Sequence, residues 1–168
     1  LRAIAGFIDP QTGDVALAGR SISQPGSVVP PERRGIGMVF QDYALFPHLS
    51  VADNISFGLV RATADEKTAA VREMLELVGL SDKAQAYPHE LSGGQQQRIA
   101  LARALAPKPK LLLMDEFCQF QMQWDFVVAR VLILLCGESV GKVCLRNDQS
   151  FGVQNTNVLL LIPQDIAK

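Results

Sequence analysis

Apolar positions recur through the middle of the chain at the spacing of a helix. Four of them lie three or four residues apart and share one helical face: Val71, Met74, Leu75 and Val78. Thr63 precedes Glu66 by three residues, which is typical of a capping box, and Gly79 supplies the left-handed residue that ends many helices. The pattern predicts a helix over residues 63–79, within a mainly helical subdomain of about residues 52–106.

Two apolar runs without alternation predict buried strands. Leu111–Met114 is an unbroken run, which favours a central parallel strand with both faces covered. Gly35–Gln41 (GIGMVFQ) predicts a second buried strand. Between them, Gln95–Ala106 predicts a helix with Ile99 and Leu105 facing inward. The alternation of strands and helices indicates an α/β fold with a mainly parallel sheet core.

Shorter signals organise the beginning of the chain. Leu1–Phe7 has the pattern of a helix end with Gly6 as its cap, so the chain is expected to begin inside an element. Asp14–Ala18 predicts a short strand between turns. Pro25–Pro31 and Asp42–Leu49 predict loops, since their prolines disfavour regular structure.

Composition excludes several classes of protein. The chain has 168 residues, enough for one domain, and 16 Lys and Arg against 17 Asp and Glu give a net charge of -1. This balance argues against a nucleic-acid partner. The longest apolar stretch, Phe126–Cys136, is interrupted by Arg130 and is short of the roughly 20 residues of a membrane span; no signal peptide is expected either. The three cysteines form no CxxC pair, which fits a reducing cytosol.

The first candidate site is the segment LSGGQQQR at Leu91–Arg98. Gly93 and Gly94 leave backbone N–H groups uncovered, Ser92 adds a hydroxyl, and a helix starts directly after. Free N–H groups at the positive end of a helix dipole are suited to phosphate. The alternative is a glycine turn before a helix, without any ligand.

The second candidate is the pair Asp115 and Glu116, which follows the buried strand at the edge where open α/β sheets bind ligands. Successive strand side chains point in opposite directions, so one acid can hold a phosphate-bound Mg²⁺ while the other polarises a water. Gln41 is the last residue of the other predicted strand, where an amide can coordinate a metal or orient water. Solvated acids and an ordinary surface glutamine are the alternatives.

The order and spacing of these segments resemble the ATP-binding subunit of an ABC transporter. LSGGQQQR is similar to the ABC signature, LLLMDE to the Walker B strand with its following glutamate, and VFQDYALFPHLSV to the Q-loop. The resemblance covers nearly all of residues 1–116 and implies a partial P-loop NTPase-like ABC nucleotide-binding domain. YPHELSGGQQQRIALARALAPKP most resembles importers of ferric iron, with sulfate, polyamine and sugar importers similar.

The resemblance implies ATP and Mg²⁺ as cofactors and a role for each matching position. Gln41 would contact the Mg²⁺ or the water, Asp115 would bind Mg²⁺, and Glu116 would be the general base for ATP hydrolysis. The γ-phosphate held by a second nucleotide-binding subunit, in a head-to-tail dimer, would be contacted by Ser92, Gly93, Gly94 and Gln95.

The same resemblance implies a partner and a location. Transmembrane permease subunits would contact the loop near Tyr43–Leu49, and the protein would lie peripherally on the cytoplasmic face of the plasma (inner) membrane. Its function would be to couple ATP hydrolysis to the uptake of a solute, ferric iron or another inorganic ion.

The sequence departs from the family in two places. The family has a GxGKST loop just before a segment like Leu1–Gly6, and no GxxxxGK[ST] occurs in the 168 residues. The chain is therefore expected to be truncated before residue 1 and inactive alone. Gly137–Lys142 has the wrong spacing for this loop. After Glu116 no D-loop is recognisable, and Asn147 stands where the family has its switch histidine, so residues 117–168 are expected to be a divergent, degraded or frame-shifted remainder.

Two alternatives belong to other functional classes. The chain can be a non-catalytic fragment whose signature caps ATP on a partner subunit. It can also be a DNA-repair or chromosome-structure ATPase of the same family. The lack of coiled-coil heptads, the lack of a basic face and the aromatic loop after Gln41 argue against that second alternative.

Overall fold

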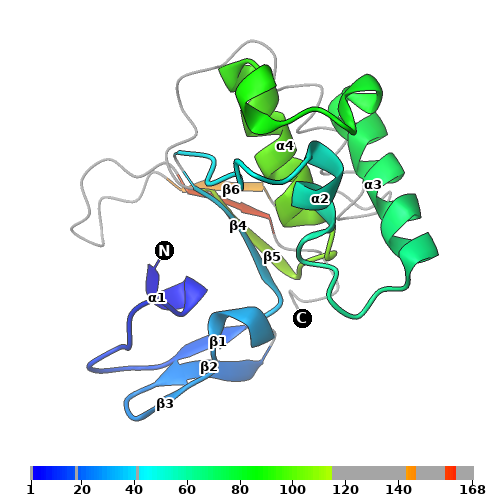
Figure 1. Ribbon diagram of the computed structural model, residues 1–168. Helices are drawn as coiled ribbons and strands as arrows, with labels where there is room; N and C mark the ends of the chain where they lie inside the picture. Colours follow the sequence, from blue (N-terminus) through cyan, green and yellow to red (C-terminus); the bar gives the residue numbers. More distant parts are fainter. Residues whose placement is uncertain (1, 18, 41, 115–142, 147–157, 162–168) are drawn as a thin grey trace.

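The main sheet of the computed structural model has four strands in the order β4-β5-β7-β6 (Figure 1). Residues 2–17, 19–40, 42–114, 143–146 and 158–161 are described. The strands are β4 (Ile36–Val39), β5 (Leu111–Met114), β6 (Val143–Arg146) and β7 (Val158–Leu161). β4 and β5 confirm the two buried strands predicted from the sequence. The interpretations of Phe126–Cys136, Gly137–Lys142 and Asn147 concern positions outside the described residues.

The described part of the sheet has one parallel pair and two antiparallel pairs. β4 and β5 are parallel, with Val39 opposite Met114. β7 is antiparallel to both of its neighbours, β5 and β6. Residues 147–157 alone join β6 to β7, and a connection of this length can close an antiparallel pair. A parallel pair needs a crossover of about a dozen residues or more.

Three helices lie together on one side of this sheet (Figure 1). They are α2 (Val51–Ser56), α3 (Ala64–Val78) and α4 (Gly93–Leu105), with short 3-10 turns at Ser81–Lys83 and Pro88–Glu90. The predicted capping box of α3 is present, and Gly79 ends the helix with φ 67°. None of the described helices is long and apolar enough to cross a bilayer.

A small antiparallel sheet and a short helix occupy the other side of β4 and β5 (Figure 1). The helix is α1 (Arg2–Ala5), and the strands are β1 (Val15–Leu17), β2 (Arg20–Gln24) and β3 (Ser27–Val28), followed by a 3-10 turn at Pro31–Arg33. The predicted loop over Pro25–Pro31 is therefore wrong in part, since β3 lies inside it. Two residues, Pro25 and Gly26, suffice to connect β2 to β3, a hairpin turn.

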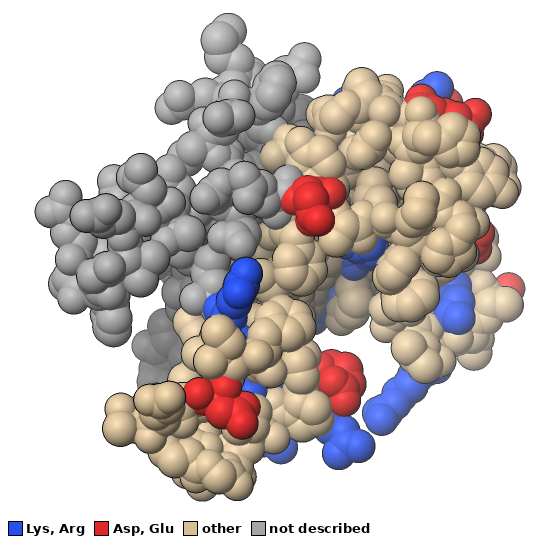
Figure 2. All heavy atoms as spheres, turned by 60° about the vertical axis from the view of Figure 1, so that its left-hand side comes forward, with Lys and Arg blue, Asp and Glu red and all other residues tan. Residues whose placement is uncertain are grey.

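The core has two parts, one on each face of β4 and β5. Val39 and Leu112 pack among the three helices, whereas Leu111 and Leu113 pack with Ala5 of α1. β5 is thus buried on both faces, as its unbroken apolar run predicts. Charges do not gather on the face shown in Figure 2, where described basic side chains are interspersed with acidic and uncharged ones.

Gly37 lets α4 approach the sheet closely. A Cβ at this position would lie 2.6 Å from the backbone oxygen of Ala104. We therefore expect Gly37→Ala to destabilise the chain by about 1–3 kcal/mol, because neither backbone can yield cheaply. The measurement is urea unfolding followed by circular dichroism. Gly93→Ala is the control, since nothing lies within 4 Å of its added Cβ. Equal midpoints for the two variants would contradict the prediction.

Candidate functional site

The segment LSGGQ forms the capped start of α4. Ser92 is the N-cap: its Oγ accepts a hydrogen bond from the Gln95 amide at 3.3 Å, and its own amide donates to Gln95 Oε1 at 2.9 Å. These two bonds are a capping box, which satisfies two backbone donors reciprocally. The sequence predicted a turn here with the helix beginning at Gln95, but the helix already begins at Gly93.

This helix start has room for a phosphate. Ser92, Gly93 and Gly94 are exposed, and a Cβ built on either glycine would meet nothing within 4 Å. Among the contacts of the described residues, the amides of Gly93 and Gly94 have no acceptor. Uncovered amides at the positive end of a helix of 13 residues fit an anion such as a phosphate group of ATP.

Two side chains that sequence reasoning missed hold this helix start in place. Gln96 donates from Nε2 to the carbonyls of Pro88 and Leu91, at 3.0 and 3.1 Å. Arg98 donates to the carbonyl of Val78 at 2.9 Å and so joins α4 to the end of α3. No local pattern announces these bonds, because each depends on how distant segments pack.

The other predicted site residues, Gln41, Asp115 and Glu116, lie outside the described residues. The strands that precede them are described, and they end together. β4 and β5 are parallel neighbours in which Val39 is opposite Met114. The carboxyl ends of parallel strands share one sheet edge, so β4 and β5 end at the same edge. Among the described residues, no group of three or more His, Cys, Asp or Glu is placed to hold a metal.

The loop at Asp42–Leu49 is fixed by a buried asparagine. Asn54 of α2 has 0% exposure; its Oδ1 accepts from the Phe46 amide at 2.9 Å, and its Nδ2 donates to the carbonyls of Phe46, Leu49 and Ser50 at 3.0–3.1 Å. The position was predictable as buried, because Asn54 is in helical phase with Val51. What the amide binds was not predictable. The structure confirms the loop and shows that hydrogen bonds of Asn54 join its backbone to α2.

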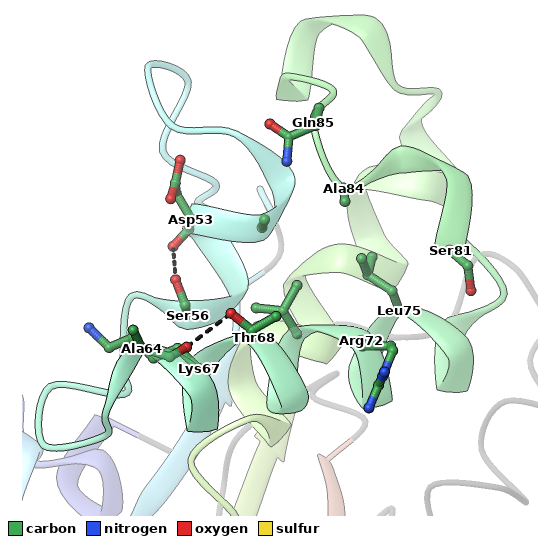
Figure 3. Close-up of a pocket in the computed structure, with 12 residues that line it drawn as sticks. Asp53, Ser56, Ala64, Lys67, Thr68, Arg72, Leu75, Ser81, Ala84 and Gln85 are labelled. Atoms are coloured by element: carbon green, nitrogen blue, oxygen red, sulfur yellow. Dashed lines mark hydrogen bonds between the residues drawn. The ribbon is translucent and has the colours of Figure 1, made fainter.

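A groove of about 530 Å³ lies between α2, α3 and residues 81–85 (Figure 3). None of the predicted site residues lines it. Two of its hydroxyls are bound to their own helices: Ser56 Oγ donates to the carbonyl of Asp53 at 3.4 Å and Thr68 Oγ1 to that of Ala64 at 2.9 Å. These hydroxyl protons therefore do not converge on a ligand in the groove.

Comparison with known proteins decides the family. A family model described as ABC transporter matches residues 1–119. The chain belongs to this family. A solved dimeric structure of an ATP-binding cassette in a post-hydrolysis state, bound to ADP and Pi, superposes with a TM-score of 0.70 at 27% identity, covering 83% of this chain and 64% of that one. The partial ABC nucleotide-binding fold expected from the sequence is thereby confirmed.

Similar proteins are named as importer subunits. The spermidine/putrescine import ATP-binding protein PotA of Thermobifida fusca is 54% identical over 118 residues, 69% of this chain and 30% of that protein. The Fe(3+) ions import ATP-binding protein FbpC of Mesorhizobium japonicum is also 54% identical, with 69% and 32% covered. A putative 2-aminoethylphosphonate import ATP-binding protein PhnT of Salmonella typhimurium is 50% identical, with 69% and 31% covered. The chain spans about a third of the length of these relatives.

The capping box makes Ser92 a stabilising residue in its own right. We expect Ser92→Ala to lower the free energy of unfolding by about 1 kcal/mol, because the Gln95 amide loses its acceptor. Ser92→Asp should leave stability close to that of the parent chain, since aspartate is an equally good N-cap. Urea unfolding of the two variants measures the difference, and a Ser92→Ala midpoint equal to that of the parent would contradict the role.

Proposed function

We propose that the chain is part of the ATP-binding subunit of an ABC importer, which couples ATP hydrolysis to solute uptake from the cytoplasmic face of the inner membrane. The observation that carries this proposal is the exposed, capped start of α4, with two uncovered amides and open space in front of both glycines. Within a chain of the ABC family, this geometry suits contact with a nucleotide phosphate. The family match through residue 119 supports taking residues 1–116 as the ATPase domain, with residues 117–168 as its divergent remainder.

In this proposal the helix start meets ATP that is bound to a second subunit of a head-to-tail dimer. The γ-phosphate is contacted by the hydroxyl of Ser92, the backbone amides of Gly93 and Gly94, and the side-chain amide of Gln95. Asp115 binds Mg²⁺, Glu116 accepts the proton of the attacking water, and Gln41 contacts the metal or that water. Mg²⁺, when bound, neutralises charge on the phosphates. The shared edge at which β4 and β5 end supports this grouping.

The loop Tyr43–Leu49 is the proposed contact with the permease. It combines exposed positions, such as Pro47 and His48, with a backbone held rigidly by Asn54. A loop already held in one conformation loses little entropy when a partner binds. Ferric iron is the solute we propose, on the resemblance to ferric importers; a polyamine is the alternative. Uptake of labelled ferric iron against labelled spermidine by cells that carry the gene separates the two.

The proposed contact with ATP on a second subunit is tested by association with an intact importer ATPase subunit. We expect size-exclusion chromatography to show a complex with a non-hydrolysable ATP analogue and none without it. Ser92→Asp should weaken the complex at least about tenfold, because a carboxylate then faces the phosphate while the helix cap is kept. Association that is equally strong with and without the nucleotide would contradict the contact with ATP, and so would a complex that Ser92→Asp does not weaken. Either result would leave the chain as an inert fragment.

Hydrolysis tests the catalytic assignment separately. We expect the 168-residue chain alone to release no phosphate from ATP above background, since the family's phosphate loop does not occur in its sequence. The readout is a phosphate-release assay with Mg²⁺, and the matched variant is Glu116→Gln. Turnover by the chain that Glu116→Gln abolishes would show instead that it is an ATPase by itself.

A further inference from the structure

The last turn of α4 holds the loop that follows β4 through a single side chain. Arg103 donates from one terminal nitrogen to the carbonyl of Ala44 at 2.6 Å and from the other to the carbonyl of Tyr43 at 3.0 Å. The donor and its acceptors are 59 and 60 residues apart in sequence. A planar guanidinium can make both bonds at once, which a lysine ammonium on its flexible stem does less well.

The two residues held in this way have an unfavourable backbone. Tyr43 has φ 62° and Ala44 has φ 44°, which places both in the left-handed region. Residues with a Cβ rarely adopt this conformation, and two in succession persist only where the surroundings impose it. The carbonyls that Arg103 binds belong to these same two residues, so its hydrogen bonds act where the backbone conformation is least favourable.

The surroundings of Arg103 strengthen its hold. Burial lowers the pKa of the guanidinium, and the charge of Asp42 acts in the opposite direction. The guanidinium carbon also lies 5.4 Å from the centre of the Phe46 ring. That ring packs on the ring of Phe57, with 4.3 Å between the two ring centres. A partly desolvated cation near an aromatic ring and two carbonyls binds them more strongly than an exposed one.

The loop therefore has two anchors, and both contact Phe46: Arg103 faces its ring, and Asn54 binds its backbone. Asn54 of α2 fixes its second half from Phe46 onward, and Arg103 of α4 fixes Tyr43 and Ala44. We propose that Arg103 is a positioning residue that clamps the start of this loop in its left-handed conformation. This goes beyond the proposed function, because the clamp needs neither nucleotide nor permease.

Amide hydrogen exchange of the full chain, followed by NMR without nucleotide, tests the clamp. The Tyr43 amide donates to the carbonyl of Phe40 at 3.0 Å and reports on the clamped turn. In Arg103→Met, which keeps the length of the side chain, we expect this amide to exchange at least about tenfold faster. The backbone amide of Asn54, bonded to the carbonyl of Ser50 at 2.8 Å, should be unchanged because this bond lies at the start of α2 and not in the clamped turn.

Rescue by glycine separates clamping from simple packing. Adding Ala44→Gly to Arg103→Met should restore much of the protection at Tyr43, because glycine adopts positive φ without strain. A packing role predicts no rescue, since glycine fills no space. Unchanged exchange at Tyr43 in Arg103→Met, or failure of Ala44→Gly to restore it, overturns the proposal. Should Arg103→Met not fold, Arg103→Lys decides: faster exchange confined to the Tyr43 turn supports the clamp, and an even increase through α3 and α4 overturns it.

Discussion

The close packing of α4 on the β4–β5 pair is the contact on which the rest of the described structure depends. Gly37 provides the space for it, and the inward face of α4 is almost closed to solvent, with Ile99, Ala100 and Ala102 at 0% exposure. α2 and α3 pack on α4 and on each other. Because an approach this close leaves little freedom to slide or tilt, both ends of α4 have fixed positions relative to the sheet. One end presents Ser92, and the other carries Arg103.

A second constraint is that some backbone carbonyls have no partner within a helix or strand, and polar side chains supply their hydrogen bonds. Arg98 binds a carbonyl at the end of α3, and Arg34 donates to the carbonyls of Ala3 and Ile4 at the end of α1. Terminal carbonyls of a helix lack partners within it, and a cation there also meets the negative end of the dipole. Asn54 does the same for a loop. These few polar side chains join helices and loops that are separate in sequence.

Features that depend on residues close together in the sequence could be predicted, and features that depend on residues far apart could not. The caps at Thr63 and Gly79 depend on residues within four positions, and the sequence revealed both. The cap at Ser92 is just as local, but the sequence analysis placed Ser92 in a turn and began the helix at Gln95, so this cap was missed. β3 has only 2 residues, too few to show a periodicity, so the loop prediction missed it. The clamp by Arg103 and the antiparallel place of β7 depend on contacts between segments far apart, and neither leaves a mark in local periodicity. The candidate site divides in the same way: its helix start was visible in the sequence, and its supports were not.

The hydrogen bonds of the helix cap at Ser92 are compatible with the phosphate contact that we propose for this residue. A hydroxyl has one donor and two acceptor lone pairs, and the helix cap uses only acceptor capacity, for the Gln95 amide. Gln95 likewise uses Oε1 for the Ser92 amide, which leaves its NH₂ group as a donor. The bonds that build the cap thus use the acceptors of these two side chains and the backbone amides of Ser92 and Gln95, and they leave the side-chain donors for a phosphate. The two demands do not compete, and the cap holds the hydroxyl and the side-chain amide beside the uncovered amides of Gly93 and Gly94, so that all the donors are already in place when an anion arrives.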